Sequence, residues 1–574
     1  DQDDLLGAAG AVRGAVAGGG RGHGPTPHPP PPGDPPPPPP PSPPLPPPGS
    51  GDFPAIPPGS PAELPRLVVE LPTQEGTGTV HRVGSGESLQ SAIRAAQPGD
   101  VILLARRAKF EQPITLPRKS GTGWITIRTE GTPTTPGRRV SLNDTLEFAR
   151  IQTATAGTPA IQTEEGASGY WFVNVHVTVS PALRSLNTLV GLGSGGGDQN
   201  ALSKGPHSLV FDRGIIRGRP DLTLRRCISL QSASTAIVHS IIAECHEKGA
   251  DSQAIAGWNG PGPFLIENNL IEGAGQNILF GGAHPGIVGL HPADMVIRYN
   301  HIRKPAEWQA SKRWSIKNSL QFKHAQRVLI YRNLIENVWT DAQTGMAIAG
   351  SSTNQSGGPT TWAETRDLTI LENVIRNAGR GMVLAGLGPN RDGNAVRASR
   401  TLIHGNVIYR LGANSPFGGN GDPIQIINGW AHVMITENTL DGTLNSLSLP
   451  SDLNPARVDS INYSRNVASF GRYGVFGSGS GIASMQARYT SYVFTNNCLY
   501  AVTEPWRDRS AAYPTPNRLV DKRGSEVMPG LAEGDVTVSP TGGCSGFDLR
   551  SGERMGALPQ LVRTLEETVA SPGV

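Results

Sequence analysis

The side chains best suited to chemistry lie at one fixed position of a repeated sequence motif. Asn277, Trp308 and Asp341 each follow a repeated asparagine by eight residues, and Lys248 holds the same position in the preceding repeat. Repeats that stack as coils usually carry like residues above one another, so a column that mixes a cation, an amide, an aromatic ring and a carboxylate is poorly explained by packing. We expect the column to line an elongated groove. The alternative is that the rings cover a joint between coils and that the charges are merely solvated.

Further polar and aromatic residues fall around this column. Tryptophan rings offer flat apolar faces on which sugars stack, and amides or carboxylates can fix sugar hydroxyls. The expected substrate-binding residues are Gln253, Trp258, Asn259, Gln276, Asn277, Trp308 and Gln343, and the expected catalytic residues are Lys248, Asp251, Lys304, Lys317 and Asp341.

The expected catalytic residues fit two mechanisms, and spacing leaves both open. In a lyase, Lys304 or Lys317 would neutralise a uronate carboxylate, and Lys248 would take the C5 proton if burial lowered its pKa. In a hydrolase, Asp251 and Asp341 would supply two carboxyl groups, whose separation decides between retention and inversion.

We expect neither a metal ion nor a cofactor. His284, His291, His301 and His324 lack the His-x-His and His-Glu-x-x-His spacings of zinc sites. The repeats also contain no Asp-x-Asp pair of the kind that could hold calcium.

A short repeated motif must position these residues. It consists of an apolar residue, two arbitrary residues, Asn, one arbitrary residue, and then Ile, Leu or Val. The asparagines are Asn269, Asn300, Asn333, Asn373, Asn406, Asn438, Asn466 and Asn497, separated by 31, 33, 40, 33, 32, 28 and 31 residues by subtraction. Two earlier copies carry Gly214 and Ser240 instead. This period predicts an all-β, right-handed parallel β-helix of about ten or more coils.

Each asparagine is expected to occupy a left-handed bend and to stack its amide on the next one. Three residues beyond these asparagines, Glu272, Arg303, Glu336, Arg376 and Tyr409 should form a solvated ladder of alternating charge.

The chain divides into three parts by composition. Residues 1–60 contain a proline-dominated stretch, Pro25 to Pro58, which predicts a disordered, extended tether. Residues 61–545 carry the repeats, and residues 546–574 form a tail for which a helical cap is one interpretation. Pairs Cys227–Cys245 and Cys498–Cys544 suit disulfides, although buried free thiols are an equal alternative.

Composition narrows the partners. Lys and Arg number 50 against 47 Asp and Glu, and the net charge of +3 is too balanced for a nucleic-acid binder. No apolar run approaches the roughly 20 residues of a membrane-spanning helix. We expect a monomer.

The segment from Glu87 to Asp100, followed by Val101 to Leu104, resembles the opening of β-helix polysaccharide lyases of the pectate and alginate lyase type, where an amphipathic helix caps the first coil. Segments 251–263, 275–282, 317–318 and 339–345 look like uncharacterised bacterial right-handed parallel β-helix proteins. The resemblance covers roughly residues 64–543. It departs from polygalacturonase-like hydrolases, because the only Gly-His-Gly, Gly22 to Gly24, lies in the leader.

The resemblance implies an extracellular bacterial protein, secreted or held at the cell surface, that acts on a polysaccharide as a lyase or a glycoside hydrolase, with acidic glycans as the expected substrates. The alternative is a non-catalytic surface module that binds glycan or mediates attachment. A purely structural spacer is a third interpretation.

Overall fold

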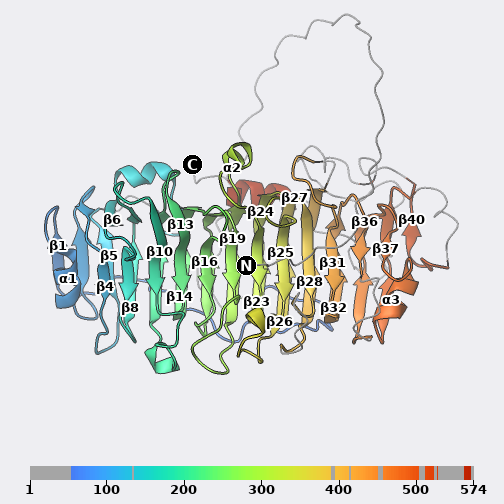
Figure 1. The fold of residues 1–574 in the computed structure, drawn as a ribbon, viewed down its shortest axis with the longest axis horizontal. Coiled ribbons are helices and arrows are strands. Elements are labelled where there is room, and N and C mark those ends of the chain that lie inside the picture. Colours follow the sequence, from blue (N-terminus) through green and yellow to red (C-terminus); the bar gives the residue numbers. More distant parts are fainter. Residues whose placement is uncertain are drawn as a thin grey trace, which may run out of the picture.

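The computed structural model describes residues 53–131, 135–388, 395–412, 415–449, 457–502, 511–521, 527, 544 and 561–570. Within these ranges the chain winds into a stack of coils, and each complete coil contributes one strand to each of three parallel sheets. Figure 1 shows the stack as an elongated body. The predicted right-handed parallel β-helix is confirmed.

Sheet 1 contains 14 described strands. They are β1 Val80–Val83, β2 Val101–Leu104, β5 Ile125–Thr129, β8 Ser168–Val173, β11 His207–Asp212, β14 Ala233–Val238, β17 Phe264–Glu267, β20 Ala293–Arg298, β23 Ala325–Tyr331, β26 Thr365–Leu371, β29 Ser399–His404, β32 Ala431–Thr436, β35 Ile461–Ser464 and β38 Tyr492–Thr495.

Sheet 2 follows the first bend of each coil and also has 14 described strands. They are β3 Lys109–Phe110, β6 Ala149–Thr153, β9 Val175–Val179, β12 Ile215–Arg217, β15 Ile241–Cys245, β18 Leu270–Gly273, β21 His301–Arg303, β24 Leu334–Val338, β27 Val374–Ala378, β30 Val407–Leu411, β33 Thr439–Leu440, β36 Val467–Ser469, β39 Cys498–Tyr500 and β40 Arg518–Leu519.

Sheet 3 closes each coil and has 12 described strands. They are β4 Ile114–Leu116, β7 Ile161–Thr163, β10 Ser185–Leu192, β13 Thr223–Leu230, β16 Gln253–Gly257, β19 Gln276–Phe280, β22 Asn318–Phe322, β25 Met346–Ser351, β28 Arg380–Ala385, β31 Ile424–Ile427, β34 Leu447–Ser448 and β37 Val475–Phe476.

The described helices are short and lie between or beside the strands. They are α1 Leu89–Ala95, η1 Leu142–Leu146, η2 Leu202–Lys204, α2 Ala306–Ser311, η3 Gln355–Gly357, α3 Ile482–Arg488, α5 Leu561–Leu565 and η6 Glu566–Ala570. Helix α1 lies at one end of the stack (Figure 1) and buries Leu89 and Ile93 against the core, as expected of a cap. No described helix is long and apolar enough to cross a bilayer.

The interior is built from apolar columns that the repeat predicts. On sheet 1, Ile237, Ile266, Ile297, Ile330 and Ile370 pair in register from coil to coil, and all five are buried. Because each pair stacks at the strand spacing of about 4.8 Å, the column excludes water along the whole axis.

The asparagine ladder stands at the bend between sheets 1 and 2. The side-chain amide of Asn300 donates to Asn333 Oδ1 at 2.9 Å, and the backbone N–H of Asn300 donates to the same oxygen at 3.0 Å. The pattern repeats from coil to coil. It begins where the backbone N–H of Ser240 donates to Asn269 Oδ1 and ends where that of Asn497 donates to Asn517 Oδ1. The spacing did not predict Asn517. The predicted ladder is confirmed.

The left-handed residue at this bend is not the asparagine but the residue before it. Tyr299, Arg332 and Glu372 have φ of 56°, 51° and 51°. The expectation that the asparagine adopts the left-handed conformation is therefore wrong. The asparagine turns its amide inward to the ladder, and the strained neighbour presents its side chain outward, where Arg332 Nε donates to Glu372 Oε2 at 2.8 Å.

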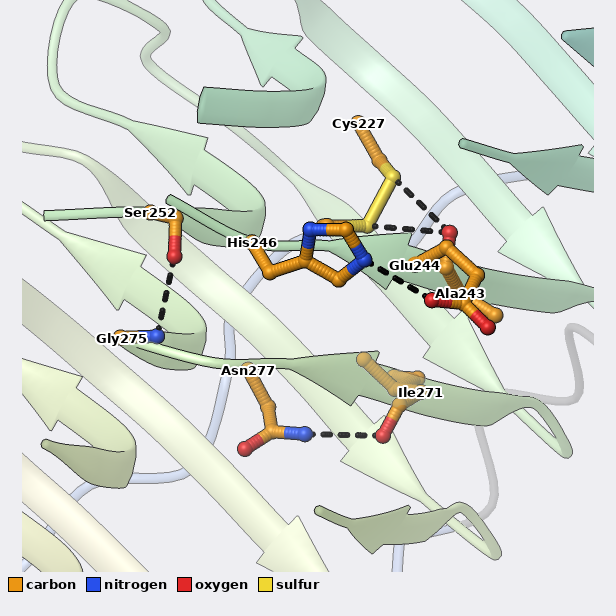
Figure 2. The surroundings of a disulfide bond; sticks show 9 residues. Cys227, Ala243, Glu244, His246, Ser252, Ile271, Gly275 and Asn277 are labelled. Atoms are coloured by element: carbon orange, nitrogen blue, oxygen red, sulfur yellow. Dashed lines mark hydrogen bonds and ion pairs between the residues drawn. A yellow bond between two sulfur atoms is a disulfide. The ribbon is translucent and has the colours of Figure 1, made fainter. Parts of the chain in front are cut away.

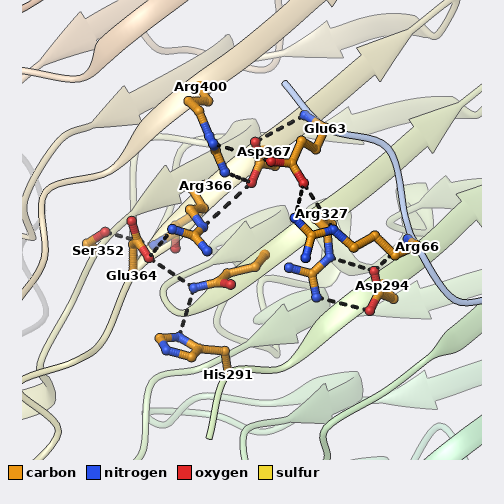
Figure 3. Close-up of polar contacts among 12 residues, drawn as sticks. Glu63, Arg66, His291, Asp294, Arg327, Ser352, Glu364, Arg366, Asp367 and Arg400 are labelled. Carbon is orange, nitrogen blue, oxygen red and sulfur yellow. Dashed lines mark hydrogen bonds and ion pairs between the residues drawn. The ribbon is translucent and has the colours of Figure 1, made fainter. Parts of the chain in front are cut away.

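The N-terminal segment 53–72 covers the outer face of sheet 1. Outward side chains such as Trp171, Leu265 and Leu329 form one buried apolar cluster with Val69, against which Leu64 packs. Figure 3 shows the hydrogen bonds that hold this segment to the sheet: the backbone N–H of Glu63 donates to Asp367 Oδ1 and that of Arg66 to Asp294 Oδ1. The segment thus occupies much of this face, from β8 to β32.

Sheet 2 is covered as well. Leu561, Leu565 and Val569 from α5 and η6 cluster with Leu334, Val374 and Val407, and Val140 and Phe148 cover Ile215 and Ile241. The predicted charge ladder exists, with Arg303 Nε donating to Glu272 and Arg376 Nε to Glu336. Glu272 and Glu336 are buried rather than solvated, which corrects that expectation, because other parts of the chain lie over this sheet.

All four cysteines are paired in the structure. Cys227 of β13 and Cys245 of β15 join sheets 3 and 2 between two consecutive coils (Figure 2), and Cys498 joins Cys544. The disulfide alternative is confirmed over free thiols. Residues 1–52 and 545–560 lie outside the described residues, so the proposed tether and the boundaries at 60 and 545 stay predictions.

Candidate functional site

The predicted mixed column does not form, because the path from the asparagine ladder to sheet 3 varies in length. Ile255, Ile278, Leu320 and Ile348 pair in register. By subtraction, they follow Ser240, Asn269, Asn300 and Asn333 by 15, 9, 20 and 15 residues. Asn277 therefore lies beside Ala254 and Ser319, whereas Lys248 and Asp341 lie in loops that precede sheet 3 and Trp308 lies in helix α2.

Asn277 and Lys304 lie inside the coil. The Asn277 amide donates to Ile271 O (Figure 2) and Arg303 O, both at 2.8 Å. The Lys304 ammonium is fully buried and meets five oxygens at 2.7–3.4 Å: Gly273 O, Ala274 O, Gly275 O, Asn277 Oδ1 and Asn318 O. The structure thus contradicts the expectation that either residue touches a polymer.

Trp308 belongs to a buried aromatic cluster. Its ring meets His246 edge-on with centroids 5.3 Å apart, and His246 stacks on Trp314 at 3.9 Å. Trp339 and Ile316 complete the cluster. The alternative that the ring covers a joint between coils is correct for Trp308, whose faces are not free to stack on a sugar.

The remaining loop residues tie this cluster together at its surface. Lys317 pairs with Asp251, Asp341 Oδ2 accepts the backbone N–H of Ile316 at 2.9 Å, and Gln343 Oε1 accepts the Asn318 amide at 2.6 Å. Lys248 is exposed and donates to Lys312 O at 3.3 Å. These contacts join segments 246–252, 312–318 and 339–345 to one another. Catalytic roles for Lys248, Asp251, Lys317 and Asp341 and a binding role for Gln343 stay predictions.

An open cleft of about 360 Å³ lies on the outer face of sheet 3, over its early coils. Gln162 of β7, Thr188 and Gly191 of β10, and Ser229 of β13 form its floor, because Gly191 pairs with both Gln162 and Ser229. Its walls contain Glu164, Glu165, Gly193, Ser194, Gly195, Asp198, Gln199 and Lys204. A smaller hollow of about 150 Å³ lies on sheet 1, between the N-terminal segment and β32, β35 and β38. The cleft on sheet 3 is more than twice that volume, so we take it as the candidate ligand site.

Arg226 and Trp258 border the cleft on the side of the later coils. Arg226 pairs in register with Thr188, and its guanidinium lies 5.2 Å from the centroid of the Trp258 ring. The Trp258 indole N–H donates to Gly195 O at 2.9 Å, which fixes the ring against the wall. Both side chains are half-buried.

The Arg226 guanidinium has no ion-pair partner among the described residues within 4.0 Å. Its one hydrogen bond is a long one, from Nη1 to Asn187 Oδ1 at 3.3 Å. Burial, with a smaller effect of neighbouring Arg225, lowers the pKa of Arg226 to about 10, against an opposing effect of the Asp251 and Glu247 carboxylates, so it remains cationic at neutral pH. A planar cation with unused donors is suited to a carboxylate or sulfate ligand.

Asn259 positions the wall of the cleft rather than a ligand. Its buried amide donates to Ser194 O and Gln199 O, both at 2.9 Å, and its Oδ1 accepts the backbone N–H of Ile287 at 3.1 Å. Gln231 Oε1 accepts the backbone N–H of Trp258 at 2.9 Å.

The predicted glutamines form a row that continues from Arg226. Arg226, Gln253 and Gln276 pair in register, and the Gln253 amide donates to Gln276 Oε1 at 3.1 Å. The Gln276 amide in turn donates to Gln321 Oε1 at 3.0 Å. Both predicted glutamines are 1% exposed, so their main contacts are with one another.

The structure therefore brings Trp258 and Asn259 together beside the cleft, and it places Gln253 and Gln276 in a hydrogen-bonded row that continues through Gln321 and Asn318 to Gln343. It adds Arg226 and the cleft lining, none of which the sequence predicted. Among the described residues, no three His, Cys, Asp or Glu side chains gather as metal ligands would.

Searches against family models and curated proteins find no match for this chain. Among solved structures it is similar to a mutant of the PL6 family alginate lyase AlyGC, with a TM-score of 0.42 and 11% identity, over 86% of this chain and 59% of that one. A mannuronic acid specific family 6 lyase from human gut microbiota gives 0.40 and 10%, over 79% and 93%. A pectate lyase gives 0.31 and 10%, over 83% and 88%.

These neighbours are polysaccharide lyases, as the sequence resemblance predicted. The chain spans about three fifths of the length of the AlyGC lyase. The chemistry of the cleft has to be argued from its own residues.

Proposed function

We propose that this protein binds an acidic polysaccharide in the cleft on sheet 3. The observation that carries the proposal is the Arg226 guanidinium, a cation without an ion-pair partner that stacks on Trp258 at the border of an open polar cleft. Two N–H groups of one guanidinium match the two oxygens of a sugar carboxylate.

The rest of the cleft suits the body of a sugar. Gln162, Thr188 and Ser229 present an amide and two hydroxyls along the floor, which can exchange hydrogen bonds with ring hydroxyls. The half-buried Trp258 ring adds apolar surface beside the cation. Such a mixture of a few polar groups and one aromatic face is typical of glycan sites.

Binding is better supported than cleavage. A lyase needs a base as well as a cation, and the ionisable residues that line the cleft are Glu164, Glu165, Asp198 and Lys204. The Ser194 hydroxyl donates to Asp198 and lowers the pKa of its carboxyl, which makes Asp198 a weaker base. The Lys204 ammonium donates to Asp198 O at 3.1 Å.

The two disulfides favour a secreted or surface-attached protein, because such bonds persist in oxidising compartments. This location is the one expected of a bacterial extracellular module that binds acidic glycan.

A panel of polymers tests the proposal. We expect calorimetry to show binding of uronate-containing polysaccharides that weakens as salt rises, no binding of neutral dextran, and no rise in absorbance from unsaturated ends. Equal affinity for dextran, or no binding of any uronate polymer, would contradict the proposal. Formation of unsaturated ends would show that the site cleaves.

A further inference from the structure

Gly191 lies in the middle of the cleft floor, inside strand β10. It pairs in register with Gln162 on one side and with Ser229 on the other, and both of these residues also line the cleft. Neighbouring strands are about 4.8 Å apart, so the backbones of Gln162 and Ser229 lie roughly 10 Å apart across Gly191. The floor therefore has bare backbone at its centre, between two polar side chains.

The fold does not require a glycine at this position. The backbone of Gly191 lies outside the left-handed region that favours glycine. A Cβ atom on Gly191 would lie 3.6 Å from Pro159 Cγ and 4.0 Å from Gln162 Cβ, which are ordinary van der Waals contacts. Alanine would therefore fit here without any movement of its neighbours.

Two other glycines of the same lining differ from Gly191, because the fold does require them. Gly193 has a φ of 86°, and a Cβ atom there would lie 2.6 Å from Gln199 Oε1. A Cβ atom on Gly195 would lie 2.3 Å from Trp258 Cζ2. Packing thus explains these two glycines and leaves Gly191 unexplained.

The other strands of sheet 3 carry a side chain at the position equivalent to Gly191. From β4 to β31, the described residues that pair in register in this row are Thr115, Gln162, Gly191, Ser229, Ala256, Leu279, Gln321, Ala349, Val383 and Gln425. A glycine inside a strand lowers stability, and it often marks a place where a ligand approaches the backbone closely.

The side chains on either side of Gly191 keep hydrogen-bonding capacity for a ligand. The Gln162 amide donates to Thr115 Oγ1 at 3.1 Å, and the Gln231 amide donates to Ser229 Oγ at 3.2 Å. Neither the Gln162 carbonyl oxygen nor the Ser229 hydroxyl hydrogen has a partner among the described residues. One acceptor and one donor therefore flank the bare backbone, which suits the hydroxyls of a sugar.

We infer that Gly191 is a specificity-determining residue of the cleft, because its missing side chain lets one pyranose ring of the glycan lie directly on the floor. Hydroxyls of this ring bind Gln162 on one side and Ser229 on the other. This inference rests on the proposed function, since it requires the glycan to occupy the same cleft.

Arg226 contacts a different sugar unit from the one on Gly191. Arg226 pairs with Thr188, which precedes Gly191 by three residues, so the two positions are roughly 10 Å apart along the strands as well as one strand apart. A polymer, rather than a single sugar, can contact both.

Substitution of Gly191 tests the inference, with polygalacturonate and polymannuronate as the probes in calorimetric titrations. We expect Gly191→Ala to weaken binding about threefold and Gly191→Val to weaken it about 30-fold or more, because a larger side chain takes more of the space of the ring. The melting temperature, measured by circular dichroism, should stay the same or rise, since both residues suit a strand better than glycine does.

Ser185→Val is the matched control. It adds a branched side chain at an exposed position of the same strand, outside the lining, and should leave both affinities unchanged. If the valine variant fails to fold, the alanine variant decides, and an unchanged affinity overturns the inference.

The outcomes separate this inference from the proposed function. If both Gly191 variants bind as the wild-type protein does while Arg226→Ala weakens binding, the inference is overturned and acidic-glycan binding stands. If the wild-type protein binds neither polymer, or if Arg226→Ala leaves both affinities unchanged, the proposed function fails and this inference fails with it.

Discussion

Replacing Lys304 by methionine is expected to lower the free energy of unfolding by about 3–5 kcal/mol. Methionine keeps most of the length and apolar volume but removes every donor. Four backbone carbonyls and Asn277 Oδ1 would lose the ammonium that now satisfies them inside the coil. Burial lowers the pKa of Lys304 well below its usual value, whereas five acceptor oxygens and no donor favour the protonated form.

Denaturant unfolding followed by circular dichroism measures the effect. Lys248→Met is the matched control, because Lys248 is exposed and its one contact is a long hydrogen bond to Lys312 O, so a change within about 0.5 kcal/mol is expected. If Lys304→Met lowered the free energy of unfolding by no more than Lys248→Met does, the ammonium would not be needed to stabilise the bend between sheets 2 and 3.

Replacing Arg226 by alanine is expected to weaken binding of uronate polymers by about 10- to 100-fold, the equivalent of one charge-assisted hydrogen-bonded pair. The melting temperature should change little, because the guanidinium makes one long hydrogen bond and one ring contact. Calorimetric titration measures the loss. Arg226→Lys should recover part of the affinity, since it restores charge without the planar fork.

Arg313→Ala is the matched control for Arg226. Arg313 also lies over a tryptophan, 4.5 Å from the Trp314 ring centroid, but it belongs to the loop cluster that the sequence favoured. We expect it to leave glycan affinity unchanged. A larger loss with Arg313→Ala than with Arg226→Ala would move the site to those loops.

The features that the sequence predicts well are those that repeat. Asn300, Asn333 and Asn373 recur with apolar neighbours at fixed offsets, and each contact joins one coil to the next, so the pattern alone predicts the ladder and the core column. The offset to sheet 3 is not fixed, because loops of different length intervene. A column counted across those loops therefore loses its register.

The face on which a side chain lies is equally hard to predict where the strand limits are unknown. Gln276 and Asn277 are neighbours in β19, where side chains alternate between the two faces, so Gln276 joins the outer row and Asn277 points into the coil. Lysine is usually a surface residue, yet Lys304 is fully buried. A retrospective signal for the cleft does exist: two adjacent arginines, Arg225 and Arg226, break the alternation of apolar and polar residues in the strand between Leu224 and Cys227.

The position of the bound glycan is the central claim, and hydrogen–deuterium exchange at saturating uronate polymer tests it most directly. We expect protection of backbone amides in 185–195, 223–231 and 253–259, which form the floor and border of the cleft. Protection confined to 246–252 and 305–317, or to the outer faces of sheets 1 and 2, would contradict a site on sheet 3.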